Sequence, residues 1–199
     1  MKIERFIGGV LESNGYVLYQ QDGGNSFIVD PGYSPGRFIR FVGAHRLHVQ
    51  GILLTHHHYD HVGAVEQIRA EFDCPVYLHR RDWDRYGKQV DVSLEDGDRL
   101  SLDGEDLTVV HTPGHTGGSV CFYAEKSRAV FTGDTIFNVD LGRTDLEDGS
   151  PEEMEDSILN RVDRWSNDMI IYPGHGDSCT MKTVRKINRE FLDIVEKRE

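Results

Sequence analysis

The segment 54-LTHHHYDHVG-63 leaves an apolar, strand-like run and enters a predicted helix. Its polar residues follow the pattern H-x-H-x-D-H, from His56 to His61. If the chain stays extended here, His56 and His58 point to the same side because strand side chains alternate, and Asp60 and His61 then turn back toward them. Imidazole and carboxylate groups are ligands that zinc, iron and manganese favour. The segment therefore predicts a metal site at the end of a strand.

Three further segments each place one possible ligand in a glycine-rich turn after an apolar run. Their sequences are 112-TPGHTGGS-119, 131-FTGDT-135 and 172-YPGHGD-177, which supply His115, Asp134 and His175. A single His or Asp in a turn is commonly solvated or capping, but glycines that allow close backbone approach recur at each of these turns. We therefore expect one strand-loop edge to gather all the ligands. The other histidines are interpreted as structural or exposed, and His57 is expected to face away from the site; they are His45, His48, His57, His79 and His111.

Outside these motifs, the sequence alternates short β-like runs with helical stretches. Helices are predicted over 35–44, 62–72, 151–165 and 181–197. The third has a capping box, in which Ser150 and Glu153 flank a proline at the first helical position. No repeat, linker or composition break divides the chain. The pattern predicts one α/β domain over residues 1–199 that ends in a single C-terminal helix, about 181–197.

Composition limits the classes of partner. The chain has 199 residues and a formal net charge of -12, which repels polyanions, so nucleic acid is not an expected partner. No run approaches the length of an uncharged membrane span, and the N-terminus does not resemble a secretion signal. Three widely spaced cysteines fit reduced thiols. We expect a soluble, cytoplasmic protein without membrane association, and the sequence does not predict its oligomeric state.

The four motifs resemble those of the metallo-β-lactamase superfamily, specifically its glyoxalase II-like (hydroxyacylglutathione hydrolase-like) branch in a short, single-domain form. The resemblance extends from 29-VDPG-32 to Gly176. It implies an αββα sandwich with a dinuclear metal centre at the strand-loop edge. The implied ligands of the first metal are His56, His58 and His115. Those of the second are Asp60, His61 and His175, and Asp134 bridges the two.

The resemblance also implies the reaction, hydrolysis of an acyl thioester such as S-D-lactoylglutathione by a metal-bridging hydroxide. Two divalent ions, zinc first and iron or manganese as alternatives, lower the pKa of bound water toward ~7. A thiolate leaving group, with a pKa near ~8.5, needs no strong general acid. Asp60 and Asp134 are the predicted catalytic carboxylates, Asp60 orienting the hydroxide.

Arg143, in the segment 142-GRTD-145, is the candidate substrate contact. It can bind a substrate carboxylate through two hydrogen bonds. The other interpretation is a surface arginine paired with Asp140 or Asp145. Glyoxalase II enzymes commonly carry lysine and then an aromatic residue where this chain has Arg143 and Asp145. Their helical C-terminal domain, which contacts glutathione, has no counterpart in residues 177–199, so the thiol portion of the substrate stays open.

Several alternatives share these residues. A persulfide dioxygenase also carries a G-R-T-D segment and would use a single iron on His56, His115 and Asp134. A lactone or other ester hydrolase would use the same metals. A β-lactamase is disfavoured, because Asp134 stands where many of those enzymes have a cysteine ligand. A noncatalytic metal-binding protein is also disfavoured, because structural zinc sites are typically closed and cysteine-rich.

Overall fold

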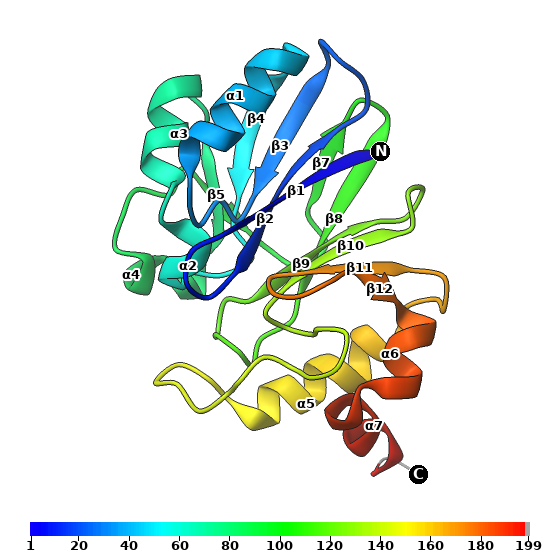
Figure 1. Cartoon of the computed structure of the whole chain (residues 1–199). Coiled ribbons are helices and arrows are strands. Elements are labelled where there is room, and N and C mark those ends of the chain that lie inside the picture. Colours follow the sequence, from blue (N-terminus) through cyan, green and yellow to red (C-terminus); the bar gives the residue numbers. More distant parts are fainter. Residues whose placement is uncertain (198–199) are drawn as a thin grey trace.

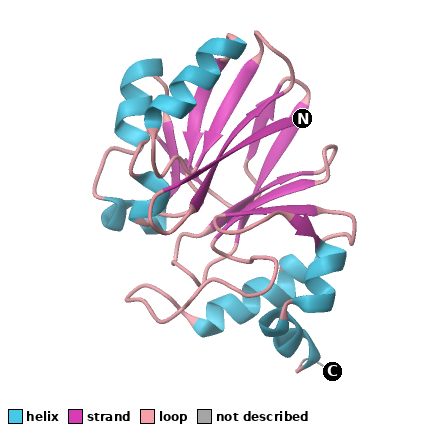
Figure 2. Cartoon of the chain, in the orientation of Figure 1, coloured by secondary structure: helices cyan, strands magenta, loops and turns pink. Residues whose placement is uncertain are grey.

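Two β-sheets lie face to face, and helices cover the outer face of each (Figures 1 and 2). The structure is a computed structural model that describes residues 1–197. Residues 198 and 199, the end of the predicted 1–199 domain, lie outside the described residues. Helices α1 (Pro35–His45) and α3 (Val65–Phe72) cover one sheet, and α5 (Pro151–Asn160), α6 (Met181–Ile187) and α7 (Arg189–Glu196) cover the other. The predicted αββα sandwich is confirmed.

The first sheet contains the strands of the N-terminal half in sequence order. Its strands are β1 (Lys2–Gly8), β2 (Ser13–Tyr19), β3 (Asn25–Val29), β4 (His48–Leu53), β5 (Val76–His79) and β6 (Val92–Leu94). The first three are antiparallel, and from β3 to β6 the neighbours are parallel. Parallel neighbours need long crossovers. Here these contain α1, then α2 (Tyr59–Val62) and α3, and finally η1 (Arg80–Asp82) and α4 (Trp83–Tyr86).

The second sheet contains the later strands, again in sequence order. These are β7 (Arg99–Leu102), β8 (Glu105–His111), β9 (Val120–Ala124), β10 (Ala129–Gly133), β11 (Ile170–Pro173) and β12 (Cys179–Thr180). All neighbours are antiparallel except β10 and β11, which are parallel. The crossover between those two contains α5 and η2 (Val162–Arg164).

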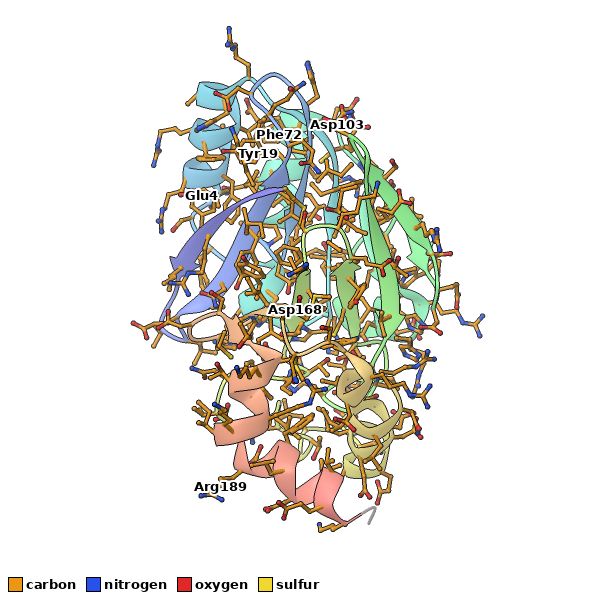
Figure 3. The ribbon with its side chains drawn as sticks, turned by 90° about the vertical axis from the view of Figure 1, so that its right-hand side faces the viewer. Glu4, Tyr19, Phe72, Asp103, Asp168 and Arg189 are labelled. Carbon is orange, nitrogen blue, oxygen red and sulfur yellow. The ribbon has the colours of Figure 1, made fainter. Side chains whose placement is uncertain are left out.

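Apolar side chains fill three layers, one between the sheets and one under each set of helices. Strand β2 is buried along its whole length. Because strand side chains alternate, Tyr16 and Leu18 enter the layer between the sheets, whereas Val17 and Tyr19 face the helices. Tyr19 lies at the end of the molecule opposite Arg189, the first residue of α7 (Figure 3). Within residues 1–197, no helix has both the length and the apolar composition needed to cross a bilayer.

The prediction of a single C-terminal helix is wrong, because the chain forms two helices that meet at Asn188. This residue has extended backbone angles (φ -78°, ψ 102°) and no exposed surface. Its side-chain oxygen accepts a hydrogen bond from the backbone N–H of Phe191, which caps α7. Its amide group donates to the carbonyls of Phe137 and Asp140 at 3.1 and 2.8 Å. The interruption therefore fixes the loop around residues 137–140.

Substitution of Asn188 by alanine removes the cap and leaves two loop carbonyls without their donor. We expect the free energy of unfolding to fall by about 2 kcal/mol or more, measured by urea denaturation. Thr180→Ala is the matched control, because Thr180 caps α6 without holding a distant loop. It is expected to cost about 1 kcal/mol. Equal losses in the two variants would contradict the role given to Asn188 in holding the loop.

Candidate metal centre

Each predicted ligand follows the end of a strand. His56, His58, Asp60 and His61 follow β4, with the last two in helix α2. His115 lies in the β8–β9 connection, Asp134 comes directly after β10, and His175 comes two residues after β11. The structure therefore brings together residues from four segments that are far apart in the sequence.

Three histidines form the first group. The ring of His56 lies 4.9 Å from the rings of His58 and His115, centroid to centroid. His58 Nδ1 lies 2.8 Å from His115 Nε2. Two ring nitrogens this close cannot both carry a proton, so at least one lone pair points into the gap. Each of the three rings offers a nitrogen within 4.8 Å of the other two, which is compatible with one shared ion.

Asp60, His61 and His175 form the second group. His175 Nε2 lies 3.3 Å from Asp60 Oδ2 and 3.3 Å from His61 Nε2. Asp134 lies between the two groups: its Oδ2 is 3.5 Å from His115 Nε2 and 3.4 Å from His175 Nε2, and its Oδ1 is 3.3 Å from His61 Nε2. A carboxylate in this position faces both groups.

The protein fixes which nitrogen of four rings faces the centre. In each, Nδ1 contacts a protein oxygen that can accept its proton, so Nε2 is the nitrogen that faces the centre. The contacts are His56 with the hydroxyl of Thr55 (2.9 Å), His61 with Asp30 Oδ2 (3.3 Å), His115 with the carbonyl of Arg143 (2.8 Å) and His175 with the carbonyl of Leu11 (3.0 Å). This arrangement is typical of histidine ligands of metals.

Two buried polar atoms in the centre make no hydrogen bond within the described chain: His56 Nε2 and Asp134 Oδ1. An unsatisfied buried acceptor costs about 1–3 kcal/mol. Both atoms are acceptors that a cation would satisfy, and imidazole with carboxylate is a donor set that suits zinc, iron and manganese. The residues present therefore fit divalent metal ions.

The two groups differ in charge. Burial and the neighbouring histidines lower the pKa of His56, and burial and His115 lower that of His58 to about 4, so these rings are neutral near pH 7. For His175, burial alone would lower the pKa, but hydrogen bonds with Asp134 and Asp60 outweigh it and raise the value to about 9. The second group thus attracts positive charge more strongly.

Glycines at the centre meet neighbouring backbone or ligands so closely that a side chain has no room. A Cβ on Gly142 would lie 1.6 Å from the carbonyl oxygen of Asp134, and one on Gly174 would lie 2.1 Å from Asp134 Oδ1. The carbonyl of Arg143, next to Gly142, holds His115. The backbone of the segment 142-GRTD-145 therefore helps to position both Asp134 and His115.

Two cavities open onto the centre. One, of about 540 Å³, is lined by Leu11, Tyr59 and Leu146 together with ligand residues. The other, of about 470 Å³, is lined by residues 137–143 and also reaches His115, Asp134 and His175. Arg143 borders both cavities, but its guanidinium makes two hydrogen bonds to the carboxylate of Asp145, at 2.7 and 2.8 Å. Of the two partners proposed from sequence, the structure selects Asp145.

Sequence reasoning did not find Asp82, which joins two ligand loops from outside the centre. Its buried carboxylate accepts hydrogen bonds from the backbone and ring of His57, the hydroxyl of Thr116 and the backbone of Gly118. Burial alone would raise its pKa, but these hydrogen bonds hold the pKa below its usual value. His57 thus turns toward Asp82. Nothing in the segment 80-RRDWD-84 distinguishes Asp82 from a surface acid.

Comparisons with known proteins find similar sequences and structures. The sequence model of the metallo-beta-lactamase superfamily matches residues 8–175. A hydroxyacylglutathione hydrolase of Bdellovibrio bacteriovorus is 36% identical, over 90% of this chain and 67% of that protein. The hydroxyacylglutathione hydrolase GloC of Haemophilus influenzae is 32% identical, over 86% of this chain and 89% of that protein.

Two solved structures are similar along their whole length. The BLEG-1 B3 metallo-beta-lactamase superposes with a TM-score of 0.87 at 33% identity, covering 94% of this chain and 98% of that chain. TTHA1623 in a di-iron-bound form superposes with a TM-score of 0.81 at 32% identity, with the same coverage. The fold of this chain thus has counterparts in a metallo-beta-lactamase and in a protein solved in a di-iron-bound form.

Substitution of Asp82 by alanine removes the acceptor of four hydrogen bonds, two of them fully buried. We expect the free energy of unfolding of the metal-free protein to fall by about 3 kcal/mol or more, measured by urea denaturation. Glu147→Ala is the control, since Glu147 makes an exposed ion pair with Arg85 and should contribute little to stability. A loss at Asp82 no larger than that at Glu147 would refute its role in joining the loops.

Proposed function

This chain belongs to the metallo-beta-lactamase superfamily, and we propose that it hydrolyses acyl thioesters with the help of two divalent metal ions. The observation that carries the proposal is the orientation of the histidines. Four rings are anchored through Nδ1 so that Nε2 faces a common centre that also receives His58 and the two carboxylates, Asp60 and Asp134. Histidines that are oriented in this way typically bind a metal ion.

The proposed ligands follow the two groups. His56, His58 and His115 would hold one ion. Asp60, His61 and His175 would hold the other, with Asp134 shared between them. When bound, two such ions supply a hydroxide at neutral pH and polarise a carbonyl oxygen.

The remaining chemistry depends on the chain itself. Asp60 and Asp134 contribute negative charge and acceptor oxygens that orient a water proton. The two cavities leave room for the acyl and thiol portions of a substrate on different sides of the centre. Besides the proposed ligands, the titratable side chains that line them are Tyr59, Asp140 and Arg143.

A thioester fits this set of residues because its leaving group needs little assistance. A thiolate has a pKa near ~8.5 and departs without a strong general acid. Lysine, serine and cysteine are absent from the residues that line these two cavities in the described chain. Two relatives named hydroxyacylglutathione hydrolase, 36% and 32% identical, support the same class of reaction.

The second candidate is oxidation of a persulfide at a single iron. His56, His115 and Asp134 form a two-histidine, one-carboxylate set, the arrangement used for oxygen chemistry. The two buried atoms without a hydrogen bond, His56 Nε2 and Asp134 Oδ1, both belong to this subset. The close approach of Asp60, His61 and His175 favours two ions and therefore hydrolysis.

Hydrolysis of S-D-lactoylglutathione, with metal content measured on the same sample, tests the proposal. We expect turnover that a chelator abolishes and about two metal ions per chain. His58→Ala and Asp134→Ala should each lower kcat by about 100-fold or more, because each removes a ligand. His48→Ala should change nothing, since His48 is exposed and outside the centre.

Each alternative predicts a different result. Full activity in Asp134→Ala would refute the shared carboxylate. Oxygen uptake with a persulfide, from a sample with one iron per chain and no thioesterase activity, would decide for the dioxygenase. Activity toward lactones or other esters alone, with two metals bound, would support the dinuclear centre but refute the thioester as its substrate.

A further inference from the structure

The residues that line the two cavities indicate the polarity and charge of the substrate on either side of its reactive bond. We propose that the thiol portion of the substrate is uncharged and apolar, and that a conjugate of a thiol with free carboxylates is a poor substrate. This inference rests on the proposed thioester hydrolysis. It depends on three observations: apolar side chains line the cavities, one arginine lies at their border, and an aspartate is already paired with that arginine.

Apolar side chains line both cavities outside the proposed ligands. Leu11, Tyr59 and Leu146 line one cavity, and Phe137, Val139 and Leu141 line the other. These six come from four separate parts of the chain: the β1–β2 hairpin, the start of α2, the loop after β10 and the segment before α5. The walls are therefore built from side chains that favour apolar groups.

Several of these side chains are also exposed, which is unusual for their type. Leu11, Tyr59, Val139 and Leu146 have exposed fractions of 48%, 66%, 51% and 38%. Large apolar side chains that gather at the mouth of a cavity commonly mark a ligand-binding surface. Because the four surround one centre, an apolar group of the substrate would remove water from several of them at once.

Among the described residues that line either cavity, Arg143 is the only lysine or arginine. Both of its hydrogen bonds to Asp145 are short, at 2.7 and 2.8 Å, and the guanidinium lowers the pKa of Asp145 to about 2. Asp145 is thus ionised throughout the physiological range and cancels the charge of Arg143. A substrate carboxylate would have to displace an equivalent carboxylate, with little net gain.

Other acids also disfavour the binding of a substrate carboxylate. Asp140 lines the cavity next to Arg143, and Asp148 lies 3.6 Å from His57 Nε2 beside the first ligand group. The whole chain carries a formal charge of -12. Outside the metal centre, a carboxylate on the substrate therefore meets neutralised or negative surface, whereas an uncharged group meets apolar side chains.

One pair of substrates differs mainly in whether the carboxylates of the thiol portion are free or esterified. S-D-lactoylglutathione and its dimethyl ester share the acyl group and the peptide skeleton but differ in their two carboxylates. For the metal-loaded enzyme, we expect kcat/KM to be about tenfold or more higher for the diester. Raising the ionic strength should narrow this difference, since salt screens the repulsion.

Asp145→Asn frees the guanidinium of Arg143 while keeping the size of the side chain. The ratio of kcat/KM between diester and free acid is expected to fall about fivefold in this variant. Glu147→Gln is the matched control, because it removes one nearby acid whose partner, Arg85, lines neither cavity. Its ratio should equal that of the unmodified chain.

The outcomes separate this inference from the proposed function. Preference for the free acid, lost in Arg143→Ala, would show that Arg143 binds a substrate carboxylate and would overturn the inference alone. Equal kcat/KM for the two thioesters would also overturn it while leaving thioester hydrolysis intact. Hydrolysis of neither thioester by a protein with two bound metals would refute the proposed function, and this inference with it.

Discussion

The buried carboxylate of Asp30 links the two ligand groups of the candidate centre. It accepts hydrogen bonds from the backbone and hydroxyl of Thr55, at 2.8 and 2.5 Å, and contacts His61 Nδ1 at 3.3 Å. The hydroxyl of Thr55 in turn receives the Nδ1 proton of His56. One acid at the end of β3 thereby orients a ring in each ligand group and ties the end of β4 to its neighbour. A positive φ of 45° at Asp30 gives the chain the turn that this contact requires.

The loops that carry the candidate ligands can converge because two glycines let the backbone approach Asp134 closely. Gly142 and Gly174 leave no room for a Cβ, so Asp134 can approach both ligand groups at once. The first ligand group contains neutral histidine rings, whereas the second contains a histidine whose pKa is raised by two neighbouring aspartates. Such an asymmetric centre, at the edge where two sheets meet, combines a rigid scaffold with access from two cavities.

Local patterns in the sequence predict the ligands and the sandwich, because each ligand lies in a short motif beside an apolar strand. Contacts between distant residues are not visible in this way. The β1 strand has mixed polarity because it lies at an edge of its sheet, and the break at Asn188 depends on carbonyls about fifty residues away. Asp82 and Asp30 resemble ordinary loop acids until the fold buries them. For Arg143, the sequence offers two acidic partners, and only the geometry selects one.

The contact between Leu11 and His175 has a consequence for folding. The carbonyl that orients the last ligand belongs to the first hairpin, 164 positions earlier in the chain. The side chain of Asn14, in β2 of the same hairpin, donates to the carbonyls of Pro173 and Gly176. Contacts between residues this far apart in the sequence are slow to form, because closing a long loop costs conformational entropy before the contact contributes favourable energy. During synthesis, therefore, the seven candidate ligands cannot all come together until the loop after β11 has left the ribosome.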